Sequence, residues 1–276
     1  MSGRNPSEAG GGLGQDGAVD HGQRTFPGRR TVRLGDVTGA GRLRLDAVAR
    51  FLQDVATDDA ADAGLAEGWV LRRIALRIHR FPQLHQEVDL LTWCSGVAAS
   101  AAERCTTLVV DGRVLVEAVA LWVFVGPDGR PTRLDRERFA VYGVATERRI
   151  STRLHLDDGP DPDAADVRRR DWPLRAADVD VLEHVNNAVS LAALEDALRD
   201  EGRAEAAPPW AVEVEYRAPI DPDDRPVLVW TDATDGVLTG ALRCGDSARS
   251  TFRVRSSDGD RDAFPDGFPA AVAARP

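Results

Sequence analysis

Residues 178–187, "DVDVLEHVNN", place acids, a histidine and two asparagines directly before the apolar run "AVSLAALEDAL". An aspartate such as Asp180 can act as a base or a nucleophile, and a histidine such as His184 exchanges protons near neutral pH. Asn186 and Asn187 fall where a helix begins, and the free N–H groups of a first turn can polarise a carbonyl. The segment therefore indicates a site that activates water. The alternative is a polar loop that only caps a helix.

The elements around this segment occur twice along the chain. In the first half, the pattern predicts a strand at 30–34, a helix at 45–64 and strands at 69–78, 87–95, 103–110 and 113–126. In the second half, it predicts a helix at about 187–200 and strands at 210–218, 226–234, 236–245 and 248–256. A single long amphipathic helix can bury its apolar stripe only if the sheet curls around it. The chain is therefore expected to be an α+β protein with a duplicated sheet that wraps a helix in each half.

The duplication can be tested by an ungapped alignment of "RLGDVTGAGRL" with "RAADVDVLEHV". Arg33, Asp36 and Val37 then match Arg175, Asp178 and Val179, all 142 positions apart. Thr38 stands where the second copy has Asp180, and Arg42 stands where it has His184. The shared residues are expected to serve the fold, and the differences mark where the second copy has specialised.

The composition along the chain predicts the domain boundaries. Residues 1–28 are Gly-rich and polar and are expected to be a disordered tail, and residues 257–276 a loose C-terminal tail. An acidic, Pro-punctuated and then basic stretch predicts a linker at 151–171. The first folded unit is then expected at 29–150, and the second, with the chemical segment, at 172–256.

Charge and cysteine use exclude several classes of protein. The formal net charge of −10 over 276 residues argues against a nucleic-acid binder. The three cysteines are odd in number and widely spaced, which is typical of thiols in a reducing cytoplasm and forms no metal-ligand pattern. The N-terminus has no apolar core of a signal peptide, and no apolar run is long enough for membrane insertion.

The segment "DVDVLEHVNN" also resembles the D-x-D-x-x-x-H-V-N-N signature of hotdog-fold thioesterases. More particularly, the chain is similar to the acyl-acyl-carrier-protein (acyl-ACP) thioesterases of plants and bacteria, which are tandem, double hotdogs. The blocks that carry this likeness are "RLGDVTGAGRLRLDAVARFLQDVATDDAADAG", "WVLRRIALRIHRFPQLHQEVDLLTWCSG", "ALWVFVGPDGRPTRL" and "VEVEYRAPI". The resemblance covers about residues 30–256 and implies hydrolysis of the thioester between a fatty acyl chain and the phosphopantetheine arm of ACP.

Carried over by position, the family's catalytic Asp falls on Asp180 and its catalytic His on His184. The family's Asn between them falls on Leu182, and the plant enzymes' Glu-Cys pair falls on Ala218 and Pro219. Asp180 is then the expected base or nucleophile, His184 orients the thioester or stabilises charge, and amides near Val185, Asn186 and Asn187 polarise the carbonyl. Asp178 is an auxiliary candidate.

Glu215 is the nearest spare carboxylate, although Glu213 and Glu215 alternate with apolar residues as on a solvated strand face. Trp69, Trp93 and Trp122 are expected in the core or along an acyl tunnel. An acidic chain needs a local basic patch to bind an acidic carrier protein. The candidate arginines are Arg72, Arg73, Arg77, Arg80, Arg148, Arg149 and Arg168 to Arg170, although scattered surface arginines are an equal alternative.

The expected protein is a cytoplasmic acyl-ACP thioesterase that uses no cofactor and no metal and acts as a monomer or homodimer. One alternative is the same hydrolysis of acyl-CoA. The other is a non-catalytic acyl-binding hotdog protein, which Leu182, Ala218 and Pro219 favour and which Asp180 and His184 oppose.

Overall fold

The computed structural model describes residues 23–143, 150–232 and 236–256, so most of the two expected tails lies outside the described residues. The first half contains β1 (Thr25–Thr31), α1 (Leu45–Asp62), β2 (Trp69–Ile78), β3 (Glu87–Val97), β4 (Ala101–Val110), β5 (Arg113–Phe124) and the short α2 (Arg136–Phe139). The second half contains β6 (Arg168–Asp171), α3 (Ala188–Asp200), β7 (Trp210–Tyr216), β8 (Val227–Asp232), β9 (Val237–Cys244) and β10 (Ser247–Ser256). A 3-10 turn precedes each long helix, at Leu34–Asp36 and at Ala176–Asp178.

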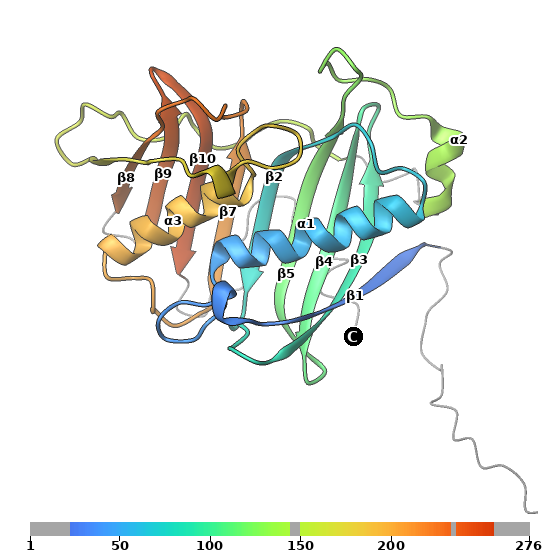
Figure 1. Ribbon diagram of the computed structural model, residues 1–276, viewed down its shortest axis with the longest axis horizontal. Coiled ribbons are helices and arrows are strands. Elements are labelled where there is room, and N and C mark those ends of the chain that lie inside the picture. Colours follow the sequence, from blue (N-terminus) through green and yellow to red (C-terminus); the bar gives the residue numbers. More distant parts are fainter. Residues whose placement is uncertain (1–22, 144–149, 233–235, 257–276) are drawn as a thin grey trace, which may run out of the picture.

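The described strands form one sheet in the order β1-β3-β4-β5-β2-β7-β10-β9-β8-β6, and every neighbouring pair is antiparallel. The order is the same in both halves when each is counted outward from the β2–β7 pair. Figure 1 shows α1 and α3 lying across the same face of this sheet. The expected α+β fold, a duplicated sheet around one long helix in each half, is thus confirmed.

The helices were predicted from the spacing of their apolar residues, and the structure shows that these residues are the ones buried in the core. In α1, the stripe of Leu45, Val48, Ala49, Leu52, Val55 and Ala56 is buried against the sheet. A tight two-residue hairpin at Asp111 and Gly112 joins β4 to β5, with φ of 50° and 70°, because such a turn requires positive φ at both positions.

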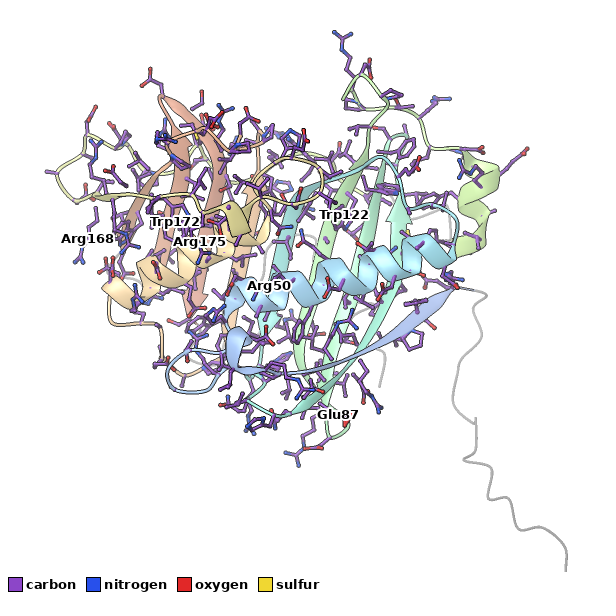
Figure 2. The ribbon with its side chains drawn as sticks, viewed as in Figure 1. Arg50, Glu87, Trp122, Arg168, Trp172 and Arg175 are labelled. Carbon is purple, nitrogen blue, oxygen red and sulfur yellow. The ribbon has the colours of Figure 1, made fainter. Side chains whose placement is uncertain are left out.

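Two of the expected boundaries are wrong. Strand β1 begins at Thr25, so residues 25–28 belong to the sheet and not to the tail, and the strand expected at 30–34 is shifted. The last four residues of the expected linker form β6, which pairs with β8 and is the counterpart of β1. The charge of its arginines led to the prediction of a linker. An edge strand can carry such charged residues, because it tolerates charge on its open side. Figure 2 shows Arg168 at this outer end of the molecule.

A third prediction, that Glu213 and Glu215 lie on a solvated face of strand β7, is also wrong. Glu213 and Glu215 do face away from the helices, but their exposed fractions are only 4% and 1%. The Glu215 carboxylate accepts hydrogen bonds from the N–H groups of His155 (2.6 Å) and Leu156 (3.0 Å). The expected solvated face is therefore covered by the linker, which crosses the outer face of the sheet.

Candidate active site

The loop that carries the chemical residues is built by backbone hydrogen bonds before α3. The N–H of Asp180 donates to the carbonyl of His184 (2.9 Å), and the N–H of Glu183 donates to the carbonyl of Asp180 (3.0 Å). Glu183 has a φ of 63°, where the first copy of the loop has Gly41 at 87°. The closed turn holds the side chain of Asp180 at a fixed place in front of the helix.

The carboxylate of Asp180 is held by two hydrogen bonds at the wall of a cavity. Its Oδ1 accepts the N–H of Leu182 (2.9 Å), and its Oδ2 accepts the side-chain amide of Asn186 (3.3 Å). Asp180, Asn186 and Asn187 line a cavity of about 340 Å³. Each carboxylate oxygen keeps a further lone pair with which it can accept a proton or a hydrogen bond from water.

His184 and Asp180 are not brought together as side chains. The His184 side chain is 51% exposed, its Nε2 lies 4.0 Å from Oδ1 of Asp221, and it is not among the cavity-lining residues. In this structure the imidazole therefore does not face the Asp180 carboxylate, and the expected role of His184 in the reaction stays a prediction. Four-residue spacing brings the two backbones together through the turn, but it does not fix the direction of the imidazole.

The expected amide donors are only partly available. The N–H of Val185 donates to the carbonyl of Ile220 (3.0 Å), and the N–H of Asn186 donates to that of Asp178 (2.8 Å). Both groups fasten the loop to its surroundings, so neither N–H is free to polarise a substrate carbonyl in this structure. Within residues 23–143, 150–232 and 236–256, the N–H of Asn187 has no hydrogen-bond partner. This amide is the free donor at the start of α3.

Both auxiliary carboxylates have structural roles. Asp178 is 5% exposed, and its carboxylate lies 2.6 Å from Nη2 of Arg175 and also accepts the Arg175 N–H (2.9 Å). Asp36 receives the N–H of Arg33 (3.0 Å) in the first copy, so this contact belongs to the duplicated scaffold. Glu215 anchors the linker on the opposite face of the sheet. Neither carboxylate lines the cavity.

The walls of the cavity come mainly from the first half of the chain. Helix α1 contributes Gln53, Ala56, Thr57 and Ala60, while Trp69 and Trp122 lie on the strands and Phe139 and Tyr142 follow in the α2 segment. In Figure 2, Trp122 lies beside α1. Trp93 is buried elsewhere, so two of the three expected tryptophans line the cavity. The apolar stripe from which α1 was predicted includes Ala56, but the sequence did not single out Gln53, Thr57 or Ala60 as cavity residues.

Two polar groups on the cavity wall are held in unreactive states. Burial raises the pKa of the Cys94 thiol to about 12, so this residue is not a thiolate nucleophile at neutral pH. Arg104 donates to Asp59 (2.5 Å) and to the hydroxyl of Tyr142 (3.2 Å), which neutralises its charge within the protein. Glu103 also lines the cavity and accepts a hydrogen bond from the Ser95 hydroxyl (2.7 Å), so Asp180 is one of two carboxylates on the wall.

The described residues contain no cluster of three or more histidines, cysteines, aspartates or glutamates that could hold a metal ion. None of the described helices is both long and apolar enough to cross a membrane.

The comparisons with known proteins identify the family. Residues 23–142 match the model of the acyl-ACP thioesterase N-terminal domain, and residues 162–260 match that of the C-terminal domain. Because these matches cover most of the chain, the protein belongs to the acyl-ACP thioesterase family and is a thioester hydrolase with a double hotdog fold.

Its similarity to individual proteins is distant. An uncharacterized protein of Mycobacterium tuberculosis is 28% identical over 225 residues, which cover 80% of this chain and 87% of that protein. The 12:0-ACP thioesterase of Umbellularia californica shares the fold with a TM-score of 0.71 at 18% identity, over 84% of this chain and 97% of that one. An acyl-ACP thioesterase of Bacteroides thetaiotaomicron shares it with a TM-score of 0.71 at 16% identity, over 84% and 98% of the two chains.

Proposed function

We propose that the protein hydrolyses fatty acyl-ACP, with the acyl chain in the cavity beneath α1 and Asp180 as the base. The observation that carries this proposal is the position of the Asp180 carboxylate and the free Asn187 N–H on one cavity of about 340 Å³. The remaining walls are largely alanine and aromatic side chains, which suit an alkyl chain. ACP is proposed as the carrier because both halves match a family described by that substrate.

The reaction needs one water and no other reactant. Asp180 takes a proton from the water as its oxygen adds to the thioester carbon, and the carbonyl electrons move onto the carbonyl oxygen. The N–H of Asn187 stabilises the negative charge that forms there. When the carbonyl forms again, the carbon–sulfur bond breaks, and the proton held by Asp180 goes to the sulfur. The products are a free fatty acid and the phosphopantetheine thiol of the carrier.

The rim of the cavity includes two exposed apolar side chains, Val181 and Leu182, with exposed fractions of 96% and 65%. Leu182 stands where the family has an Asn, but its N–H still orients Asp180 (2.9 Å). The loss of the family's side-chain amide is offset by Asn186, which donates to the other oxygen of Asp180. The departure from the family pattern thus leaves the carboxylate held at both oxygens.

Some of the arginines expected to bind the carrier are already paired. Arg168 lies 3.0 Å from Glu201, and Arg170 lies 3.0 Å from both Asp196 and Asp200 on α3. Arg148 and Arg149 lie outside the described residues. On β2, Arg77 likewise lies 3.4 Å from Glu117, and Arg72 donates to the carbonyl of Arg217 (2.9 Å). The candidates for a basic patch that form no ion pair among the described residues are Arg73, Arg80 and Arg169.

The test is thiol release from matched acyl-ACP and acyl-CoA panels, with the natural protein and with Asp180→Asn. The amide keeps the shape of the side chain but removes the base, so turnover should fall by about 10³-fold, within the range of a lost general base. Asp221→Asn is the matched control, because that carboxylate does not line the cavity. Equal turnover of Asp180→Asn and the natural protein would refute the assigned base, and a preference for acyl-CoA would refute the carrier.

A further inference from the structure

The two copies of the loop before each helix have the same hydrogen bonds, and this equivalence identifies corresponding positions. In the first copy, the N–H groups of Thr38, Leu43 and Arg44 donate to the carbonyls of Arg42, Pro82 and Asp36. In the second copy, those of Asp180, Val185 and Asn186 donate to the carbonyls of His184, Ile220 and Asp178. Within the loops the offset of 142 residues therefore holds in three dimensions, while the outside acceptors Pro82 and Ile220 are 138 positions apart. The offset also pairs Leu45 with Asn187 at the helix start, and Gln53 on α1 with Glu195 on α3.

The place in front of α1 is occupied by protein groups in the first copy. Glu195 reaches across from α3, and its Oε2 accepts the N–H of Leu45 (2.9 Å). Arg42 donates to the same carboxylate, and its guanidinium lies 4.3 Å from the ring centroid of Phe81. An anionic oxygen thus rests on the first-turn amide of the helix together with a side-chain N–H donor. This is the arrangement that an oxyanion requires.

The corresponding place in the second copy is open to the cavity. Gln53 stands at the position of Glu195, and Asn187 at that of Leu45, and both line the cavity. Among the described residues, neither the side-chain amide of Gln53 nor the N–H of Asn187 has a hydrogen-bond partner. His184, at the position of Arg42, is turned toward Asp221. No protein oxygen of the described residues therefore rests on the Asn187 N–H.

We propose that Gln53 is the second donor of the oxyanion site, across the interface between the two halves. This inference rests on the proposed function. The carbonyl oxygen of the thioester takes the place that Glu195 Oε2 has in the first copy, and it accepts the N–H of Asn187 and the side-chain amide of Gln53. A neutral amide can donate to that oxygen, whereas a carboxylate would repel the charge that develops on it. The first copy is inactive by the same reasoning, because its own carboxylate occupies the donor.

The test compares Gln53→Ala and Gln53→Glu with the natural protein on the acyl thioester that it hydrolyses fastest. Gln53→Ala removes one donor and should lower kcat about 10²-fold with little change in KM. Gln53→Glu recreates the carboxylate of the first copy on the Asn187 N–H and should lower kcat further, by about 10³-fold. Thermal unfolding of both variants should match the natural protein. Asp54→Asn is the control, because that carboxylate is 54% exposed on the same helix and pairs with Arg30.

The order of the effects distinguishes a donor from a structural residue. A structural role would lower the thermal midpoint together with activity, and it would give no reason for the longer, carboxylate-bearing side chain to be the worse replacement. Natural kcat in both variants, or a fall in activity that follows a fall in stability, would overturn the assignment of Gln53 and leave the proposed function intact. A natural protein that hydrolyses no acyl thioester would overturn the proposed function, and this inference with it.

Discussion

Glu195→Ala should destabilise the fold strongly, because Glu195 is the carboxylate of a buried ion pair between the two halves. The side chains of Arg42 and Glu195 are only 7% and 9% exposed. The substitution removes the buried carboxylate partner of the guanidinium and leaves it only the half-exposed carboxylate of Glu205, 3.5 Å from Nε. It also removes the acceptor of the Leu45 N–H. Breaking a buried pair from one side costs about 3–5 kcal/mol, so the free energy of unfolding should fall by that amount.

The measurement is urea unfolding followed by tryptophan fluorescence, since the chain has six tryptophans. Asp196→Ala is the matched control on the next residue of α3. Its carboxylate is 31% exposed and pairs with Arg170, so the loss should stay below about 1 kcal/mol. At about 2–4 °C per kcal/mol for a chain of this size class, the two variants should differ in Tm by several degrees.

A double variant separates the unpaired charge from the lost packing. Arg42→Met with Glu195→Gln removes both charges and keeps a side-chain oxygen for the Leu45 N–H. It should therefore recover most of the stability lost in Glu195→Ala. A Glu195→Ala protein as stable as Asp196→Ala would refute the reasoning, because the pair would then contribute no more than a surface contact.

Three further outcomes are expected. Ala60→Leu narrows the cavity two helical turns beyond Gln53, so the longest accepted acyl chain should lose the contacts of about three methylene groups. In kinetics with a panel of acyl chains, kcat/KM for that chain should fall about 50-fold. An unchanged chain preference would place the acyl group elsewhere. His184→Ala should lower kcat far less than Asp180→Asn, because the imidazole lies outside the cavity, and equal losses in steady-state assays would restore the histidine to the reaction. Burial of Asp46 opposes its ionisation, but hydrogen bonds from Arg44 and Arg50 outweigh this and lower its pKa. Its stabilising contribution should therefore be complete above about pH 4 and be lost as the pH falls further, so denaturant unfolding of Asp46→Asn should converge with the natural protein in acid; a constant difference would contradict this.

The strands and helices could be predicted because their signals are local. Strand β2 falls at the predicted residues 69–78, and the apolar spacing from Leu45 to Ala56 places α1. The shared Arg, Asp and Val at an offset of 142 predicted two equivalent loops, and the hydrogen bonds of both loops agree with it. The residue types also selected Asp180, since one copy carries a carboxylate where the other has Thr38.

The direction of side chains and the availability of backbone groups were decided by contacts between distant residues. The burial of Glu215 depends on the linker 59 and 60 residues away, and the pairing of the Val185 N–H depends on Ile220. The cavity that receives Asp180 belongs mostly to the first half. The hydrophobic periodicity of the sequence does not reveal these contacts, because they form only when the two halves of the sheet join at β2 and β7.

The sequence by itself thus determined the duplicated α+β architecture and the family, and it selected Asp180 as the candidate reactive group, because residue type, spacing and repetition are local properties. Only the tertiary structure decided that the His184 imidazole lies outside the cavity, that the Asn187 N–H is left without a partner among the described residues, and that Gln53 of the other half lines the same cavity. The physical reason is that hydrogen-bond partners compete in space. A donor is free for substrate only if no group from elsewhere in the fold has reached it first.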